Sequence, residues 1–216
     1  MNLVPQTKKA WILSVVIAAA LLFVAAGLYY AAGFWKADGK IAMPVDSSSV
    51  KTLDVPDFKQ KDPRWADKRI GGSDQKISKV GCTLCSVAMV MAYYGEDVDP
   101  VSLNEYLINN DGYTFRGWLK WYSAAEYAKG RVEVDYLGAP SHELIEKSLK
   151  KGRPSIVKIL LRGVIPHWVV IVGKDKGEYL VMDPLGESAG PVPLSEIADT
   201  IYSLRIYKPA EKNNPS

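Results

Sequence analysis

The sequence predicts an α+β domain that follows a single membrane-spanning helix. Two observations carry this prediction: the segment from Ala10 to Trp35 contains no charged residue, and the rest of the chain places its helical patterns before most of its strand patterns. Helices followed by a run of strands are typical of α+β domains with a largely antiparallel sheet. A chain of 216 residues with 48% hydrophobic and 24% charged residues fits one folded domain with an appendage.

Charge and cysteine content argue against two other classes of protein. The chain has 27 Lys and Arg residues against 24 Asp and Glu residues, a formal net charge of +3, whereas nucleic-acid-binding domains carry a strong basic excess. Its two cysteines, Cys82 and Cys85, are only three positions apart, so they cannot join distant parts of a fold. We therefore expect neither a nucleic-acid partner nor a disulfide scaffold.

The uncharged segment has the length of a membrane span. As a helix, its 26 residues would reach about 39 Å, which exceeds the roughly 30 Å hydrocarbon core and fits it with some tilt. Aromatic residues lie near both ends, as at membrane interfaces: Trp11, Tyr29, Tyr30 and Trp35. A cleaved signal peptide is the alternative, with Lys8 and Lys9 as its basic region and Val24-Ala25-Ala26 before the cleavage site. Because the apolar stretch is far longer than the usual ~7 to 15 residues of a signal peptide, we expect a retained anchor.

These features divide the chain into five parts. Residues 1–9 form a short N-terminus, which a weak excess of positive charge places in the cytoplasm, and residues 10–35 form the transmembrane helix. Residues 36–51 are small, polar and turn-rich, which predicts a flexible linker. The folded domain is expected at residues 52–208, outside the cytoplasm, and the polar tail 209–216 is expected to be disordered.

Within the domain, helical signals come first. The run from Cys82 to Tyr94 is apolar on nearly all sides and stops at Gly95, which predicts a buried helix. Three further helices are predicted. A proline in the first turn predicts a helix at residues 100–109, an apolar periodicity predicts one at 115–128, and a capping serine predicts one at 141–151. Alternating or continuously apolar runs predict strands at residues 131–137, 155–161, 167–173, 178–184 and 201–207.

Cys82 is the first candidate for chemistry because it begins the buried helix. A helix N-terminus supplies partial positive charge that lowers a thiol pKa, and Gly81 is a small, flexible residue just before it. The structural alternative is that Cys82 is an ordinary buried cysteine. A cysteine nucleophile needs an imidazole that accepts and later returns a proton.

Only two histidines are present, and His167 is the candidate base. His142 lies in a polar helix start, whereas His167 opens an apolar strand-like run. If residues 173–177 form the loop between two antiparallel strands, His167 lies directly opposite Asp183. Opposed residues share one face with Cβ atoms about 4.5 to 5.5 Å apart, so Asp183 could orient the ring. A strand-end histidine and a turn-forming Asp-Pro pair are the structural alternatives.

Short motifs follow one another in a specific order along residues 52–207. They are Asp54-Val55-Pro56, Gln60, Trp65, Gly81-Cys82, Ser86, Tyr94-Gly95, His167-Trp168-Val169-Val170, Gly173 and Asp183-Pro184. In this order they resemble the bacteriocin-processing, double-glycine-type cysteine peptidase family and its stand-alone relatives. The resemblance implies a papain-like fold, in which the helix with the nucleophilic cysteine packs on an antiparallel sheet that carries the histidine and the acid.

The residues and the resemblance together assign roles. Cys82 would attack a carbonyl carbon, His167 would move the proton, and Asp183 would hold the ring. Gln60 enters through the resemblance alone, as a donor to the oxyanion together with the Cys82 N–H. The family commonly has Thr or Ser where this chain has Cys85, and the transporter and ATPase portions of bacteriocin-processing members have no counterpart here.

Two other functions stay open. A C-x-x-C at a helix start is also the arrangement of thiol-disulfide oxidoreductases, although the early strand-helix-strand alternation of that fold is missing. A catalytically silent module of the same fold could bind peptide or cell-wall material. No metal or cofactor is expected, because zinc-protease and calcium-loop spacings are absent. We therefore expect a membrane-anchored, extracytoplasmic, papain-like cysteine peptidase of bacterial type that acts on a peptide or protein substrate, with amidase and transpeptidase chemistry still open.

Overall fold

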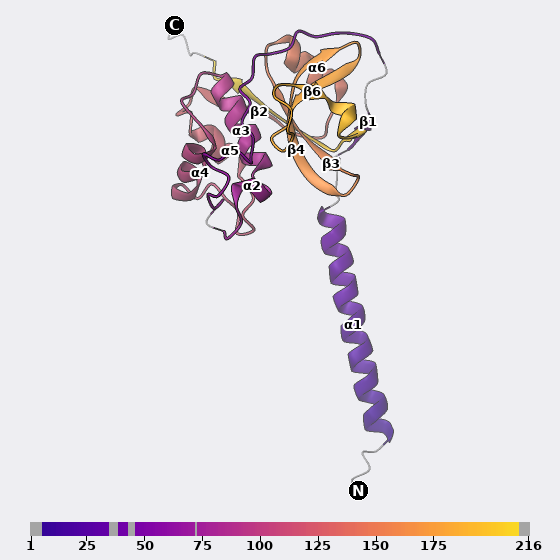
Figure 1. Ribbon diagram of the computed structural model, residues 1–216. Coiled ribbons are helices and arrows are strands. Elements are labelled where there is room, and N and C mark those ends of the chain that lie inside the picture. Colours follow the sequence, from indigo (N-terminus) through magenta and orange to yellow (C-terminus); the bar gives the residue numbers. More distant parts are fainter. Residues whose placement is uncertain (1–5, 35–38, 43–45, 72, 212–216) are drawn as a thin grey trace. The chain divides into compact units, whose positions relative to one another are not determined.

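The structure is a computed structural model of the chain that describes residues 6–34, 39–42, 46–71 and 73–211 (Figure 1). The predicted N-terminus at residues 1–9 and the predicted tail at 209–216 lie mostly outside this part of the chain. The chain divides into two compact units, residues 1–37 and residues 38–216, and each is described by itself.

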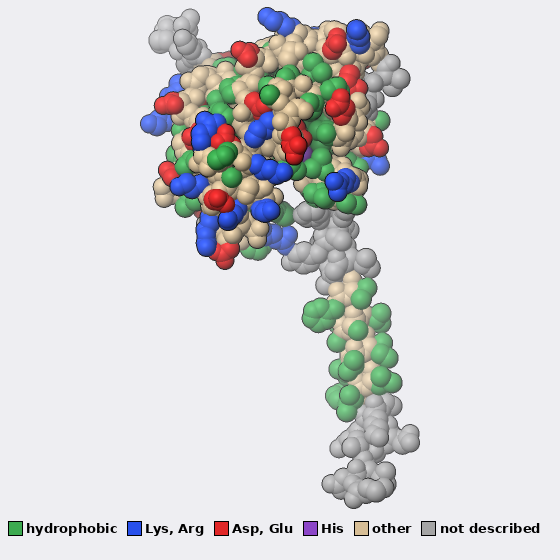
Figure 2. All heavy atoms as spheres, in the orientation of Figure 1, with side chains coloured by type: hydrophobic (Ala, Val, Ile, Leu, Met, Phe, Trp, Pro, Cys, Tyr) green, Lys and Arg blue, Asp and Glu red, His purple; other side chains and the backbone are tan. Residues whose placement is uncertain are grey.

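The first unit contains one helix, α1 (Gln6–Phe34). Between Trp11 and Val24 its large apolar side chains are exposed, and they cover the part of this helix that Figure 2 colours. Counting only the described residues, no helix of the chain is both long and apolar enough to cross a membrane. The membrane span at residues 10–35 stays a prediction.

The second unit has the α+β architecture that the sequence predicts (Figure 1). Its helices are α2 (Ile77–Val80), α3 (Cys82–Tyr93), α4 (Pro100–Asn109), α5 (Trp121–Glu126), α6 (His142–Lys150) and the short 3-10 helix η1 (Leu194–Glu196). Its main sheet is antiparallel, with the strand order β2 (Val132–Gly138), β8 (Ser203–Pro209), β3 (Ser155–Leu161), β4 (Ile165–Asp175), β5 (Glu178–Met182) and β6 (Val192–Pro193). A separate pair joins β1 (Ile41–Ala42) to β7 (Thr200–Ile201).

Helices cover both faces of this sheet. Helix α3 is buried on nearly all sides, and it forms one core cluster with side chains such as Val170 and Val172 of β4. On the other face, Ile145 and Leu149 of α6 pack with a second cluster that includes Val169. The alternation along β4 therefore separates two cores, and α3 lies against the same strand that carries His167.

The helix expected at residues 115–128 is shorter than predicted. Helical structure covers only Trp121–Glu126 of that range. A tight loop precedes it, in which the Thr114 N–H donates to the Trp118 carbonyl at 2.8 Å and Gly117 has a φ of 75°. The apolar spacing resembled a helix, but this left-handed turn stops the helix from extending further toward the N-terminus.

The predicted linker at residues 36–51 also differs from the structure, because its second half is bound to the domain. Val50 and Lys174 exchange two backbone hydrogen bonds of 2.7 and 3.1 Å, and the Gly177 N–H donates to the Ser48 carbonyl at 2.8 Å. Residues 35–38 and 43–45 lie outside the described residues. The polar composition of the segment predicted a flexible chain, but its partners lie more than 120 residues away in sequence.

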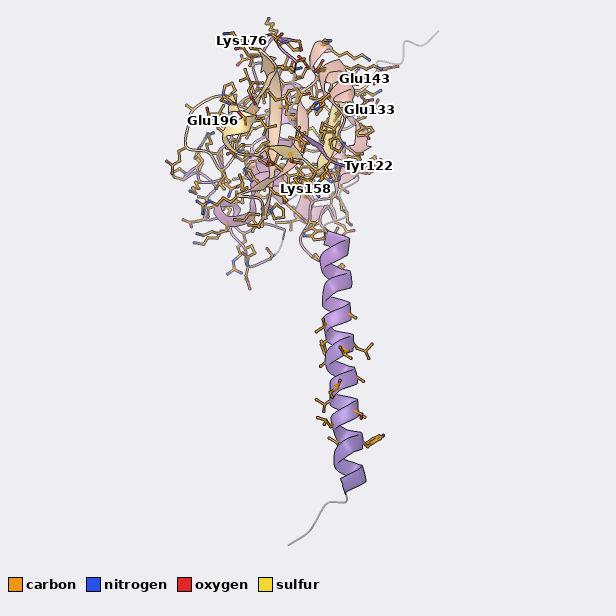
Figure 3. The ribbon with its side chains drawn as sticks, turned by 90° about the vertical axis from the view of Figure 1, so that its right-hand side faces the viewer. Tyr122, Glu133, Glu143, Lys158, Lys176 and Glu196 are labelled. Carbon is orange, nitrogen blue, oxygen red and sulfur yellow. The ribbon has the colours of Figure 1, made fainter. Side chains whose placement is uncertain are left out.

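A buried lysine holds this segment in place. The Lys174 side chain is fully buried, and its Nζ lies 2.7 Å from an Asp46 carboxylate oxygen and 2.6 Å from a Glu146 carboxylate oxygen. A buried ammonium needs such partners, because an unpaired charge in the interior is strongly unfavourable. Lys176 lies in the turn beside this cluster. Figure 3 shows Lys176 at the opposite end of the sheet from Lys158, and Lys158 is the residue that pairs with Trp168 of β4.

We predict that Gly177→Ala destabilises the domain more than Gly95→Ala does. Both glycines have a φ of 89°, but an added Cβ at Gly177 would overlap the Asp46 carbonyl oxygen, whereas at Gly95 it would meet no atom within 4 Å. We expect Gly95→Ala to lose roughly 1 to 2 kcal/mol of unfolding free energy from its backbone conformation alone. Gly177→Ala should lose more and should also accelerate hydrogen exchange at the Val50 amide. Equal losses in urea denaturation, with Val50 still protected, would contradict the packing of residues 46–50.

Candidate active site

Cys82 is the first residue of helix α3, and Gly81 lets that helix begin close to α2. A Cβ at Gly81 would lie 2.5 Å from the Ile77 carbonyl oxygen, to which the Gly81 N–H itself donates at 2.8 Å. The φ of Gly81 is −80°, an ordinary value. The small residue before the thiol therefore serves close backbone packing, where the sequence suggested flexibility. A helix N-terminus carries partial positive charge, which favours the thiolate at this position.

The edge of strand β4 explains why Cys82 lies beside His167. Strand β5 pairs with β4 only as far as Val170, so the Trp168 backbone lies beyond the end of that pairing. Helix α3 takes the place of the missing strand: the Trp168 N–H donates to the Cys82 sulfur, and the Ser86 hydroxyl donates to the Trp168 carbonyl at 3.2 Å. Cys82 and Ser86 are one helical turn apart, so they reach the two polar groups of the same residue.

His167 and Asp183 are in direct contact and both are buried. The His167 Nε2 lies 2.6 Å from the Asp183 Oδ1, which also accepts the Leu185 N–H at 2.8 Å. The other side of the imidazole is hydrogen-bonded to Cys82. Because Asp183 occupies Nε2, Nδ1 is the ring nitrogen that serves the thiol. The structure thus brings together the three residues that the sequence singled out.

The strand register that the sequence predicted for this contact is wrong. A two-residue turn, Lys176-Gly177, joins β4 to β5, and a bulge near Ile171 shifts the pairing again. Both turn residues have a positive φ, as the tightest hairpin turns require. Asp183 follows the end of β5 and is level with Val169, so His167 is its diagonal neighbour on the same face. Diagonal neighbours remain within reach of long side chains, so the two residues meet in spite of the shifted register.

The pKa values describe a charged pair. Burial raises the pKa of the Cys82 thiol, but the hydrogen bond and the charge of His167 outweigh burial and bring it below its usual value. Burial lowers the pKa of His167, whereas Asp183 and Cys82 together raise it to about 9. Burial raises the pKa of Asp183, yet its bond to His167 holds it below the usual range. These shifts together favour a thiolate, an imidazolium and a carboxylate in one site.

Gln60 is buried and is held by hydrogen bonds to two other segments of the chain. Its backbone N–H donates to the Pro184 carbonyl at 2.8 Å, and its side-chain Nε2 donates to the Ser78 carbonyl at 3.0 Å. Its Oε1 is buried and has no hydrogen-bond partner among the described residues. An amide nitrogen carries two hydrogens, so one donor of Nε2 is left for an oxyanion near the start of α3.

The other sulfur and the other histidine have different surroundings. Cys85 is fully buried, and burial together with the charge of Cys82 raises the pKa of its thiol. His142 lies 3.0 Å from the Tyr179 hydroxyl and is not part of the site. Within the described residues, no group of three or more His, Cys, Asp or Glu side chains could hold a metal ion.

One contact of the site, made by Lys59, could not be predicted from the sequence. The Lys59 Nζ donates to the Asp183 carbonyl at 2.9 Å. Lys59 directly precedes Gln60, but a lysine in a polar loop usually stays in solvent. Only its position beside Gln60 could have drawn attention to it.

Comparison with known proteins places this site in a family. A model of the Peptidase_C39 like family matches residues 52–205, which is more than half of the chain. The chain belongs to this family. The fold of this Peptidase_C39 like protein is similar to a crystal structure from Bacillus anthracis that is named as a C39-like peptidase, with a TM-score of 0.51, 19% sequence identity, and coverage of 76% of this chain and 100% of that chain. No curated protein matches the sequence.

These comparisons confirm two expectations of the sequence analysis. The papain-like α+β fold is confirmed, and the match to a peptidase-like family agrees with the expectation of a cysteine peptidase at the level of the family. In this Peptidase_C39 like protein, the helix that begins at Cys82 packs against the strand that carries His167, as that fold requires.

We predict that Asp183→Asn narrows the pH range over which Cys82 reacts as a thiolate. The His167 pKa of about 9 means that the imidazolium is lost as pH rises through this value, while the lowered Cys82 pKa means that the thiolate persists to a lower pH than in an ordinary cysteine. An asparagine cannot stabilise the imidazolium by charge, so the His167 pKa should fall and that of Cys82 should rise. The measurement is the pH dependence of iodoacetamide alkylation in a Cys85→Ser background, where Cys82 is the single thiol. Superimposable profiles for the two proteins would contradict the charged pair.

Proposed function

We propose that this chain is a thiol-dependent hydrolase that cleaves a peptide or amide bond through an acyl-enzyme on Cys82. The observation that carries the proposal is the contact chain from the partly buried Cys82 to the buried His167 and Asp183, in which the surroundings favour the thiolate and the imidazolium together. A thiolate is the reactive form of cysteine, and a neighbouring imidazolium is ready to donate its proton. This combination serves acyl transfer.

Each residue of the site has its own role in the reaction. The Cys82 sulfur forms a bond to the substrate carbonyl carbon, and the carbonyl oxygen takes up the negative charge. The Cys82 N–H and the free Nε2 hydrogen of Gln60 stabilise this oxyanion. His167 then passes its Nδ1 proton to the departing amine as the carbon–nitrogen bond breaks, which leaves an acyl group on the sulfur. Water attacks this thioester while His167 takes the water proton, and the release of the acid restores the thiolate and the imidazolium.

The surroundings of Cys85 favour hydrolysis over thiol-disulfide exchange. An oxidoreductase needs a second thiol that attacks the mixed disulfide, and this attack requires a thiolate. The Cys85 thiol is buried and its pKa is raised, so it remains protonated at neutral pH. The complete set of Cys82, His167, Asp183 and Gln60 likewise favours an active enzyme over a silent binding module.

We further propose that residues 10–35 anchor this hydrolase in a membrane and that its domain acts outside the cytoplasm on a peptide or protein substrate. The support comes from the sequence, because 26 consecutive residues carry no charge, and from the exposed apolar side chains between Trp11 and Val24. Apolar side chains exposed along a helix favour a lipid environment.

We predict that Cys82→Ala abolishes hydrolysis and that Cys85→Ser retains it. Removal of the sulfur leaves no group that can form the acyl intermediate, whereas Cys85 packs in the core and carries no step of the reaction. Proteomic identification of new protein N-termini, in cells that express each variant, is the measurement. Wild type and Cys85→Ser should yield the same set of termini, and Cys82→Ala should yield none of them. Cleavage by folded Cys82→Ala, or disulfide reduction that requires both thiols, would overturn the proposal.

Topology gives an independent prediction for the anchor. With an epitope tag added before residue 1, externally added protease should digest the domain in intact cells, while the tag remains protected. A lysed sample serves as the control, because there the tag should also be digested. A mature N-terminus near Gly27 would instead show that the apolar segment is removed as a signal peptide.

A further inference from the structure

Lys59 joins the two parts of the site that belong to different segments of the chain. Its Nζ donates to the Asp183 carbonyl at 2.9 Å and lies 3.1 Å from the Asp57 Oδ1. The next residue, Gln60, donates its backbone N–H to the Pro184 carbonyl at 2.8 Å. The dipeptide 59–60 therefore binds the dipeptide 183–184 twice, once by a side chain and once by the backbone.

The backbone of this dipeptide is itself fixed. The Lys59 carbonyl accepts the Trp65 Nε1–H at 2.7 Å, and Trp65 is only 1% exposed. On the other side of the ammonium, the Asp57 Oδ2 accepts the Gly190 N–H at 3.1 Å. Lys59 thus reaches Asp183 from a frame whose anchors, Trp65 and Gly190, do not belong to the site.

Asp183 needs such a contact because it lies beyond the end of β5, which stops at Met182. Its carbonyl has no strand partner there and is held by the Gly186 N–H at 3.2 Å in addition to Lys59. Its carboxylate meanwhile holds His167 through a single oxygen, Oδ1. A small movement of the Asp183 backbone would therefore be transmitted directly to the imidazole, and errors of about 1 Å in such positions can cost up to about 100-fold in rate.

We propose that Lys59 is a positioning residue of the hydrolase, which holds the Asp183 backbone in register with Gln60 and so keeps the imidazole and the oxyanion donor in one fixed arrangement. This proposal rests on the function proposed above. Lys59 acts through Asp183 and does not touch the reacting atoms. The simpler alternative is that its ammonium acts only as a nearby positive charge that neutralises Asp57.

The two explanations predict opposite changes at His167 in the variant Lys59→Met, which keeps the chain length but loses the donor and the charge. If Lys59 is merely a positive charge, its removal favours the imidazolium, and the His167 pKa should rise. If Lys59 positions Asp183, its removal loosens the bond that stabilises the imidazolium, and the pKa should fall below the wild-type value of about 9. The charged and titratable groups that bond to the imidazole, Asp183 and Cys82, are the same in both cases.

The experiment measures the His167 pKa by NMR and the pH profile of Cys82 alkylation in a Cys85→Ser background. Lys59→Met should lower the His167 pKa, whereas Lys59→Arg should restore it, because a guanidinium still donates to the Asp183 carbonyl. Lys61→Met is the matched control, since it removes the same charge from an exposed position two residues away. If Lys59→Met does not fold, Lys59→Gln carries the test, with a neutral but shorter donor. A His167 pKa that rises, or that is equal to the pKa in Lys61→Met, would overturn the proposal.

Hydrolysis provides a separate readout. On a substrate identified from the cleaved termini, Lys59→Met should lower kcat roughly tenfold with little change in KM, because positioning acts on the reacting geometry. A rise of KM alone would overturn the positioning role. If wild type cleaves nothing while the His167 pKa still falls in Lys59→Met, the coupling of Lys59 to the site is upheld and the hydrolase function is what fails.

Discussion

The candidate site depends on an unpaired stretch of strand edge. Strand β4 continues beyond the point where its neighbour β5 ends, and the Trp168 N–H and carbonyl at this edge need other partners. Helix α3 supplies them from Cys82 and Ser86, which fixes the start of the helix against the strand. The same interaction that satisfies the backbone therefore places the thiol beside His167. The position of the helix and the position of the thiol therefore depend on the same contacts, since a different helix position would leave buried polar groups without partners.

Three ionised groups, the partly buried Cys82 and the buried His167 and Asp183, can lie together because each charge is compensated by its neighbour. The Cys82 thiolate faces the imidazolium, the imidazolium faces Asp183, and Asp183 accepts a further backbone N–H from Leu185. Loss of any one partner leaves a buried charge without compensation, which is costly. The Lys174 cluster at the other end of β4 follows the same rule with Asp46 and Glu146. One strand thus carries two clusters of charge, each around a buried side chain, and the cluster at Lys174 binds residues 46–50.

Local patterns in the sequence predict α3, the run of strands and the proximity of His167 and Asp183, because periodicity and turn residues act over short distances. The register of the β4–β5 hairpin could not be predicted, since it depends on a two-residue turn and a bulge that strand patterns do not reveal. Gln60 is found only by resemblance to a family, because its burial depends on the distant carbonyl groups of Ser78 and Pro184. The binding of residues 46–50 is missed for the same reason: a polar run shows no partner in its own sequence.

The C-x-x-C pattern shows how environment, rather than spacing, decides reactivity. Cys82 and Cys85 lie on one helix, one turn apart, yet their thiol pKa values shift in opposite directions. At Cys82 the imidazolium outweighs the cost of burial, whereas at Cys85 burial acts in the apolar core and the charge of Cys82 adds to it. A thiolate at the first position therefore makes a thiolate at the second position less favourable. The two sulfurs cannot be equivalent partners in exchange, and the pattern that suggests a redox pair corresponds here to one nucleophile and one packing residue.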